Sequence, residues 1–144
     1  LPGPFDEFGA VFNYTSIESE FDYISNVTTG ATVTQPLVGQ SPTSWAATLY
    51  WEHGPWEARV SGTYRDEYLT LVPAQSGNDV EGKAEQLNVD FSASYDFNER
   101  LTFSFEAINL TDQADERWIN SVRQNSLNYE HTGREFVAGF RYNF

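Results

Sequence analysis

The sequence predicts an all-β fold of antiparallel strands that belong to a transmembrane β-barrel. Three observations support this: apolar residues alternate with polar ones along most of the chain, aromatic residues make up 16% of its 144 positions, and short turns alternate with long links. Successive side chains of a strand point to opposite faces, so alternation predicts sheets with one apolar and one polar face. Aromatic rings are favoured where apolar surface meets a polar boundary.

Alternation predicts six strands of the length that a tilted membrane crossing needs, about 9 to 11 residues. It is clearest in the last strand, where every second residue from Phe136 to Phe144 is apolar and the other face, which carries Glu135, Arg141 and Asn143, is mostly polar. The predicted strands cover residues 8–15, 44–52, 56–65, 87–97, 101–108 and 136–144.

The connections between these strands alternate in length. Tight turns are expected at His53-Gly54-Pro55 and around Asn98-Glu99, whereas the links near 20–43, 71–84 and 111–127 are expected to be long loops, rich in Gly, Ser, Thr, Asn and Asp. Outer-membrane barrels have short periplasmic turns and long outer loops. In this orientation, both ends of the chain lie on the periplasmic side.

Aromatic residues are expected at both rims of such a barrel, because Trp and Tyr favour the depth of the lipid headgroups. Those near the short turns are Trp51, Trp56, Phe97, Tyr142 and Phe144, and those near the long loops are Tyr14, Trp45, Tyr64 and Tyr68. A soluble β-barrel whose rings fill its core is the alternative, but it would turn its apolar face inward and its polar face outward.

Composition excludes several classes of protein. Mean hydropathy is -0.50 and no run of about 18 apolar residues occurs, so no transmembrane helix is expected. A net charge of -13 argues against a nucleic-acid partner, which needs a basic surface. Without cysteine, disulfides and thiolate chemistry are excluded. The N-terminal residues do not have the pattern of a signal peptide, and closing a membrane barrel takes about eight strands, so we expect a fragment.

A family resemblance rests on an ordered set of motifs. Asn109-Leu110-Thr111-Asp112 follows the fifth predicted strand, and Gly133-Arg134 precedes a last strand of the form Phe-x-x-Gly-x-x-Tyr-x-Phe. This set resembles the C-terminal part of TonB-dependent outer-membrane receptors. The segments 1–6, 13–15 and 37–41 resemble further parts of the same family more loosely, so the resemblance spans the chain. The terminal aromatics Phe140, Tyr142 and Phe144 resemble the signal read by the barrel-assembly machinery.

The resemblance implies that residues 1–144 are about the last six strands of a barrel of about 22 strands. The plug domain inside that barrel is not part of this chain. The implied function is uptake of a scarce nutrient (an iron chelate, cobalamin or a saccharide) into the periplasm, driven by an energy-transducing inner-membrane complex acting on the plug. The implied location is the bacterial outer membrane, with the barrel in contact with its lipid and lipopolysaccharide.

No catalytic residue is predicted from the sequence. Three acids on the polar side of the strands are expected to solvate a polar lumen and to pair with arginines on the same side. The acids are Asp90, Asp96 and Glu106, and the arginines are Arg59, Arg65 and Arg141. An outer-membrane barrel enzyme is one alternative, but no Ser-His-Asp spacing stands out. A soluble β-barrel binding module for a lipophilic ligand is the other.

No metal or cofactor site is expected. His53 and His131 are far apart in the sequence, whereas a zinc site needs three or four clustered ligands. The acids Asp112, Asp115 and Glu116 lack the spacing of a calcium-binding loop.

Ligand contacts are expected in the long loops, because binding residues concentrate on loops held by a rigid scaffold. The candidates are the aromatic residues Phe21, Tyr23, Trp118 and Tyr129. Stacking on a sugar or an aromatic chelator and simple packing within the loops are alternatives that the sequence leaves open.

Overall fold

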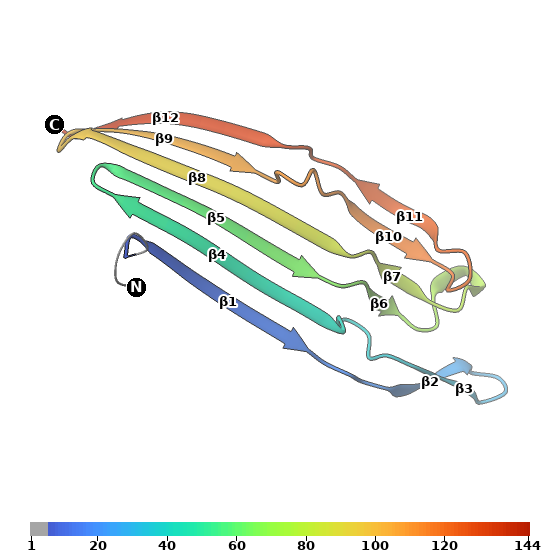
Figure 1. Ribbon diagram of the computed structural model, residues 1–144. Coiled ribbons are helices and arrows are strands. Elements are labelled where there is room, and N and C mark those ends of the chain that lie inside the picture. The colour runs from blue at the N-terminus through green and yellow to red at the C-terminus, as the bar shows by residue number, and fades with distance from the viewer. Residues whose placement is uncertain (1–5) are drawn as a thin grey trace.

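Six long strands form one antiparallel sheet. The computed structural model describes residues 6–144, except for the side chain of Ser76, so most of the N-terminal segment 1–6 lies outside the described residues. The strands are β1 (Phe8–Ser16), β4 (Thr43–His53), β5 (Trp56–Arg65), β8 (Gln86–Asn98), β9 (Leu101–Ile108) and β12 (Glu135–Tyr142). They lie side by side in chain order (Figure 1). The all-β prediction and all six strand positions are confirmed, although the last strand ends before Phe144.

Both tight turns lie at one end of this sheet, which we call the short-turn end. Residues 54–55 join β4 to β5, and residues 99–100 join β8 to β9. Gly54 has a φ of 57°, a left-handed conformation that glycine adopts without steric cost. At the second turn, Asn98 Oδ1 accepts hydrogen bonds from the backbone N–H groups of Arg100 and Leu101 at 3.0 and 3.1 Å. β1 begins and β12 ends at this same end (Figure 1).

The strand register places apolar side chains of all six strands on one face, which we call the apolar face. One continuous row crosses the sheet through Ala10, Leu49, Val60, Phe91, Ala107 and Phe136. Because side chains alternate, the neighbouring rows two residues away share this face. This face is uncovered: Leu49 is 50% exposed, Phe136 60% and Phe140 71%.

Aromatic rings gather at both ends of the apolar face. Next to the short turns, Trp56 contacts Tyr95 with ring centroids 4.4 Å apart. At the other end, Trp45 stacks on Tyr64 at 5.9 Å. Of the rings expected at the two rims, Trp45, Tyr64 and Trp56 therefore lie at the ends of the sheet to which they were assigned.

The links predicted as long loops instead form two small sheets at the opposite end, which we call the long-link end. β2 (Phe21–Asn26) and β3 (Ala31–Gln35) form a hairpin. β6 (Tyr68–Leu71), β7 (Glu81–Lys83), β10 (Asp115–Ile119) and β11 (Asn125–Glu130) form a four-stranded sheet, with a 3-10 helix η1 (Gln75–Gly77) between β6 and β7. These strands have three to six residues, too few for alternation to stand out among Ser, Thr and Asn. The loop interpretation was therefore wrong for these segments.

Deeply buried side chains lie in and beside the four-stranded sheet. Val80 is 2% exposed and Trp118 is 7% exposed. The Trp118 ring lies over Gly82, its partner on β7, so closely that a Cβ there would overlap the indole. An ion pair of 2.6 Å between Lys83 Nζ and Asp115 Oδ2 also joins β7 to β10. Within residues 6–144, no helix is long and apolar enough to cross a membrane.

We expect Gly82→Ala to destabilise the four-stranded sheet, because the added methyl group must displace the Trp118 ring. Overpacking of this kind costs about 1 to 3 kcal/mol. Gly139→Ala is the matched control, since the nearest atom to its new Cβ would be Ser104 Oγ at 3.4 Å, an ordinary contact. Amide hydrogen exchange of β7 and β10 measures the difference. Equal protection in the two variants would contradict the packing argument.

Asp79, in the segment before β7, forms hydrogen bonds to the turn after β10. Its carboxylate accepts hydrogen bonds from the Ser121 hydroxyl and, at 3.1 Å, from the Ser121 backbone N–H. These bonds, with the hydroxyl contributing most, lower the pKa of Asp79 below its usual value of 3.8. A carboxyl group whose pKa is lowered by folding stabilises the fold above its unfolded pKa, and this stabilisation is lost as the pH falls through the folded value.

We therefore expect amide protection around Ser121 to decline as the pH falls below 3.8. Asp79→Asn removes the titrating group, so protection in this variant should be weaker near neutral pH and less dependent on acid. Glu99→Gln, at the opposite end of the sheet, serves as the control. Hydrogen exchange measured across this pH range tests the expectation, which fails if Asp79→Asn follows the wild-type curve.

Candidate functional site

Polar side chains of four strands share the face opposite to the apolar one, which we call the polar face. The register places Tyr50 of β4 beside Arg59 of β5, and Arg59 beside Ser92 of β8. Ser92 in turn lies beside Glu106 of β9. The next row towards the short turns consists of Glu52, Glu57, Ser94 and Ser104. Strand alternation alone therefore collects these groups from distant parts of the chain.

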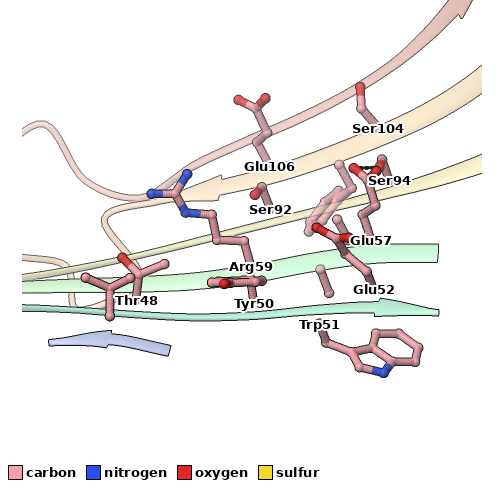
Figure 2. A pocket seen from close by; sticks show the side chains of 14 residues that line it. Thr48, Tyr50, Trp51, Glu52, Glu57, Arg59, Ser92, Ser94, Ser104 and Glu106 are labelled. Carbon is pink, nitrogen blue, oxygen red and sulfur yellow. Dashed lines mark hydrogen bonds between the residues drawn. The ribbon is translucent and has the colours of Figure 1, made fainter. Parts of the chain in front are cut away.

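These two rows line an open hollow of about 630 Å³ on the polar face. Figure 2 shows Glu57 and Arg59 of β5 and Glu106 of β9 rising into it, while the Trp51 ring points to the other side. One hydrogen bond links two of the lining groups, from Ser94 Oγ to Glu57 Oε2 at 3.2 Å. The hollow thus presents hydroxyl, carboxylate and guanidinium groups on one surface.

Gly9 on β1 makes room for the aromatic ring at the edge of the hollow. It pairs directly with Tyr50, and a Cβ at Gly9 would overlap the phenol ring, which therefore lies across the β1 backbone. A glycine inside a strand often marks such a close approach. The contact holds Tyr50 in position next to Arg59, its partner on β5.

The charges of the hollow are not paired with one another. Glu52 and Glu57 lie directly opposite each other at the end of the β4–β5 hairpin, an arrangement that electrostatic repulsion disfavours. Among the described residues, the Arg59 guanidinium takes part in none of the ion pairs. The hollow therefore offers one cation and several carboxylates to a polar partner or to water.

The expected pairing of polar-face acids with arginines was wrong. Asp90 Oδ1 accepts a hydrogen bond from the Asn109 backbone N–H at 2.9 Å, and Asp96 Oδ1 accepts one from Thr102 Oγ1 at 2.6 Å. These backbone and hydroxyl donors satisfy the two carboxylates locally. Glu106 lines the hollow and, within residues 6–144, forms no ion pair with Arg59, Arg65 or Arg141.

Both histidines lie away from the hollow and contact acids. His53 Nδ1 lies 2.5 Å from Glu7 Oε1 at the short-turn end, and His131 Nε2 lies 3.1 Å from Asp112 Oδ1 at the long-link end. Among the described residues, no group of three or more His, Asp or Glu side chains is arranged to hold a metal ion. The serine hydroxyls of the hollow thus have no histidine beside them.

The family motif forms a corner where the chain leaves the six-stranded sheet. Asn109 has a φ of 55°, a left-handed conformation that Asn tolerates better than most residues. Its Nδ2 donates to the carbonyl oxygens of Gln113 at 3.1 Å and Gly133 at 3.0 Å. Its Oδ1 accepts from the Gln113 backbone N–H at 2.7 Å. One side chain therefore holds both segments that flank the β10–β11 hairpin.

The other motif residues add bonds from this corner to its neighbours. Thr111 Oγ1 donates to the Leu87 carbonyl of β8 at 2.6 Å, and the Leu110 N–H donates to the Val89 carbonyl at 2.8 Å. Arg134 Nε donates to the Leu110 carbonyl at 3.1 Å. Gly133, which precedes β12, has a φ of 80° that favours glycine. The motif thus joins β8, β9 and β12, and every contact described here is structural.

Gln113 belongs to the same corner but sequence reasoning missed it. Its Oε1 accepts from the Leu87 N–H at 3.0 Å, and its Nε2 donates to the carbonyl oxygens of Ala114 at 2.9 Å and Glu85 at 3.4 Å. The Gln113 side chain thereby accepts and donates hydrogen bonds at the start of β8 as the backbone of a neighbouring strand would. Its position directly after the motif is the one sequence signal that points to it.

The candidate loop aromatics are spread over the small sheets. Phe21 and Tyr23 contact each other on β2 with ring centroids 5.0 Å apart. Tyr129 is 60% exposed and lies near His131, whereas Trp118 is 7% exposed in the four-stranded sheet. The burial of Trp118 favours a packing role, and the exposure of Phe21 and Tyr129 leaves a ligand contact there as a prediction.

The terminal aromatics lie on and beyond the edge strand β12. Phe140 is 71% exposed, Tyr142 52% and Phe144 110%. Phe140 packs against Phe103 of β9 with ring centroids 5.1 Å apart, and Tyr142 contacts Phe144 at 5.2 Å. The three rings are accessible, and their role as an assembly signal stays a prediction.

Comparisons with protein-family models, with curated proteins and with solved structures give no match for this chain.

We expect Asn109→Ala to destabilise the corner, because it removes the side-chain hydrogen bonds to Gln113 and Gly133, each worth about 1 kcal/mol. Asn109→Gly keeps the backbone conformation and isolates the loss of the side-chain bonds. Asn128→Ala, on exposed β11, is the control. Protease cleavage between β9 and β12 should become faster in both Asn109 variants. Cleavage as slow as in Asn128→Ala would show that the corner does not hold this region.

Proposed function

We propose that this chain is the closing part of the β-barrel of an energised outer-membrane receptor that takes up a scarce nutrient. The observation that carries the proposal is the sheet with two unlike faces, one aromatic and uncovered and the other polar. In water, a large exposed apolar surface promotes association or aggregation. In a membrane barrel, the same surface contacts lipid while the polar face lines the lumen.

The dimensions of the strands support this proposal. β4, β5 and β8 have 11, 10 and 13 residues, at or above the length that a tilted membrane strand requires. β1 and β12 are the edges of the sheet, and unpaired backbone groups are costly in hydrocarbon. In the proposed barrel, both edges pair with further strands of the same protein.

The hollow on the polar face supports a protein-filled lumen. Arg59, Glu52 and Glu57 lie on this face without salt-bridge partners among the described residues. A plug domain inside the barrel would supply polar partners for such groups. The resemblance of this chain to the receptor family rests on the motif around Asn109 and on the terminal aromatic residues. The structural corner that this motif forms and the exposure of these rings are compatible with that family.

The proposal predicts opposite outcomes for two neighbouring arginine substitutions. Val60→Arg places a charge in the middle of the apolar face, at a cost of about 2 to 4 kcal/mol in the middle of a bilayer. Ser61→Arg places the same charge on the polar face beside Asp90 and should be tolerated. The amount of full-length protein in the outer membrane, and its gel mobility before and after boiling, measure both effects.

Val60→Arg should reduce the amount of assembled barrel, and Ser61→Arg should not. A wild-type protein that migrates alike with and without boiling would contradict the membrane-barrel proposal. Equal assembly of both variants would contradict the assignment of the apolar face to lipid.

A further inference from the structure

We infer that a cleft at the long-link end binds a neutral, polyhydroxylated ligand of the saccharide class. The inference rests on the proposed function and narrows its substrate. The cleft has a volume of about 380 Å³ and lies where residues 35–42, 66–69 and 118–124 meet. Small-molecule sites generally measure about 300 to 1,000 Å³, so the cleft has the size of such a site.

Amide and hydroxyl groups from separate segments line the cleft. Gln35 ends β3 and Gln40 lies in the segment after it, and Ser121 and Gln124 come from the turn between β10 and β11. Amide and hydroxyl side chains each carry both donors and acceptors. A ligand that satisfies all of them must offer both as well, and sugar hydroxyl groups do so.

The charges of the cleft disfavour an anionic ligand. Asp66 and Glu67 line it, and no basic side chain is among its lining residues. Both carboxylates already accept hydrogen bonds, Asp66 Oδ1 from the Glu67 N–H at 3.0 Å and Glu67 Oε2 from Gln124 Nε2 at 3.4 Å. Each carboxylate has further lone pairs that can accept hydrogen bonds from ligand hydroxyl groups. Like charges would repel a carboxylate-rich iron chelate.

Two aromatic residues give the cleft apolar surface. The Tyr68 ring is held from one side by the Arg65 guanidinium, 3.8 Å from the ring centroid. Trp118 also borders the cleft, but it is 7% exposed and its ring packs against Gly82, so Tyr68 is the ring offered to a ligand. The buried Trp118 Nε1 has no hydrogen-bond partner among the described residues. Tyr and Trp combine an apolar face with a polar group. A sugar ring does the same, with C–H groups on its faces and hydroxyl groups at its edge.

The walls of the cleft are held in place by bonds outside it. Arg65 donates from Nη2 to the Gly39 carbonyl and from Nε to Ser41 Oγ, both at 2.7 Å. The Gly39 N–H donates to the Leu69 carbonyl at 2.7 Å, and the Asn120 N–H donates to the Val80 carbonyl at 3.0 Å. A cleft that is already ordered loses less conformational entropy when a ligand binds.

The test uses the full-length protein in detergent on an array of neutral oligosaccharides, with ferric citrate titrated in parallel. We expect binding to neutral oligosaccharides and none to ferric citrate. Gln124→Ala should weaken oligosaccharide binding by about tenfold, the effect of one good hydrogen bond. Gln75→Ala removes the same amide from η1, outside the cleft, and should leave binding unchanged.

An empty array, equal effects of Gln124→Ala and Gln75→Ala, or binding of ferric citrate would each overturn the inference. Gel mobility with and without boiling shows whether each variant has formed its barrel, so a folding defect is not mistaken for lost binding. If the wild-type protein shows heat-dependent gel mobility but binds no oligosaccharide on the array, the saccharide cleft is rejected and the proposed function is not. A wild-type protein without heat-dependent mobility rejects the proposed function itself.

Discussion

The whole structure depends on the cross-strand register of the six-stranded sheet. Each apolar residue of a long strand must pair with apolar residues of the neighbouring strands. Otherwise apolar and polar side chains would share a face. A slip of one residue in β5 would bring Arg59 and Glu57 among the rings and turn Val60 to the polar side. The chain has no disulfide to fix this register, and Ala107 is the one buried apolar side chain among the described residues of the six strands. The backbone hydrogen bonds between strands and the cross-strand side-chain pairs therefore maintain the register.

The corner at Asn109 protects that register where the chain leaves the sheet. β9 and β12 are adjacent, yet 26 residues separate Ile108 from Glu135 and form the β10–β11 hairpin with its flanking turns. A side chain that bonds to both Gln113 and Gly133 holds the two ends of this excursion together. The β10–β11 hairpin can then pair within the four-stranded sheet while β9 and β12 keep their register.

The six long strands could be predicted from the sequence because each is long enough for alternation to be counted. Leu101–Ile108 is an example, since four apolar and three polar residues alternate before the final Ile108. The small sheets could not be predicted, because strands such as Glu81–Lys83 are defined by tertiary pairing. Gly82 shows the reason: its role follows from the Trp118 ring, which is distant in the sequence.

The polar-face hollow was only partly predictable, for a similar reason. Alternation identified Glu106 and Arg59 as members of one face, but salt bridges depend on side-chain reach as well as on the face. Asp90 and Asp96 find nearer donors in the Asn109 backbone and the Thr102 hydroxyl. Local donors of this kind carry little side-chain entropy cost, so they compete well with long arginine side chains.

The contrast between the two ends of the molecule follows from how each is stabilised. The six-stranded sheet is one layer, and the described residues leave its apolar face uncovered. The four-stranded sheet buries Val80 and Trp118 and adds the ion pair between Lys83 and Asp115. It therefore has a small packed centre of its own, and an ordered platform at this end is what a cleft built from short segments requires.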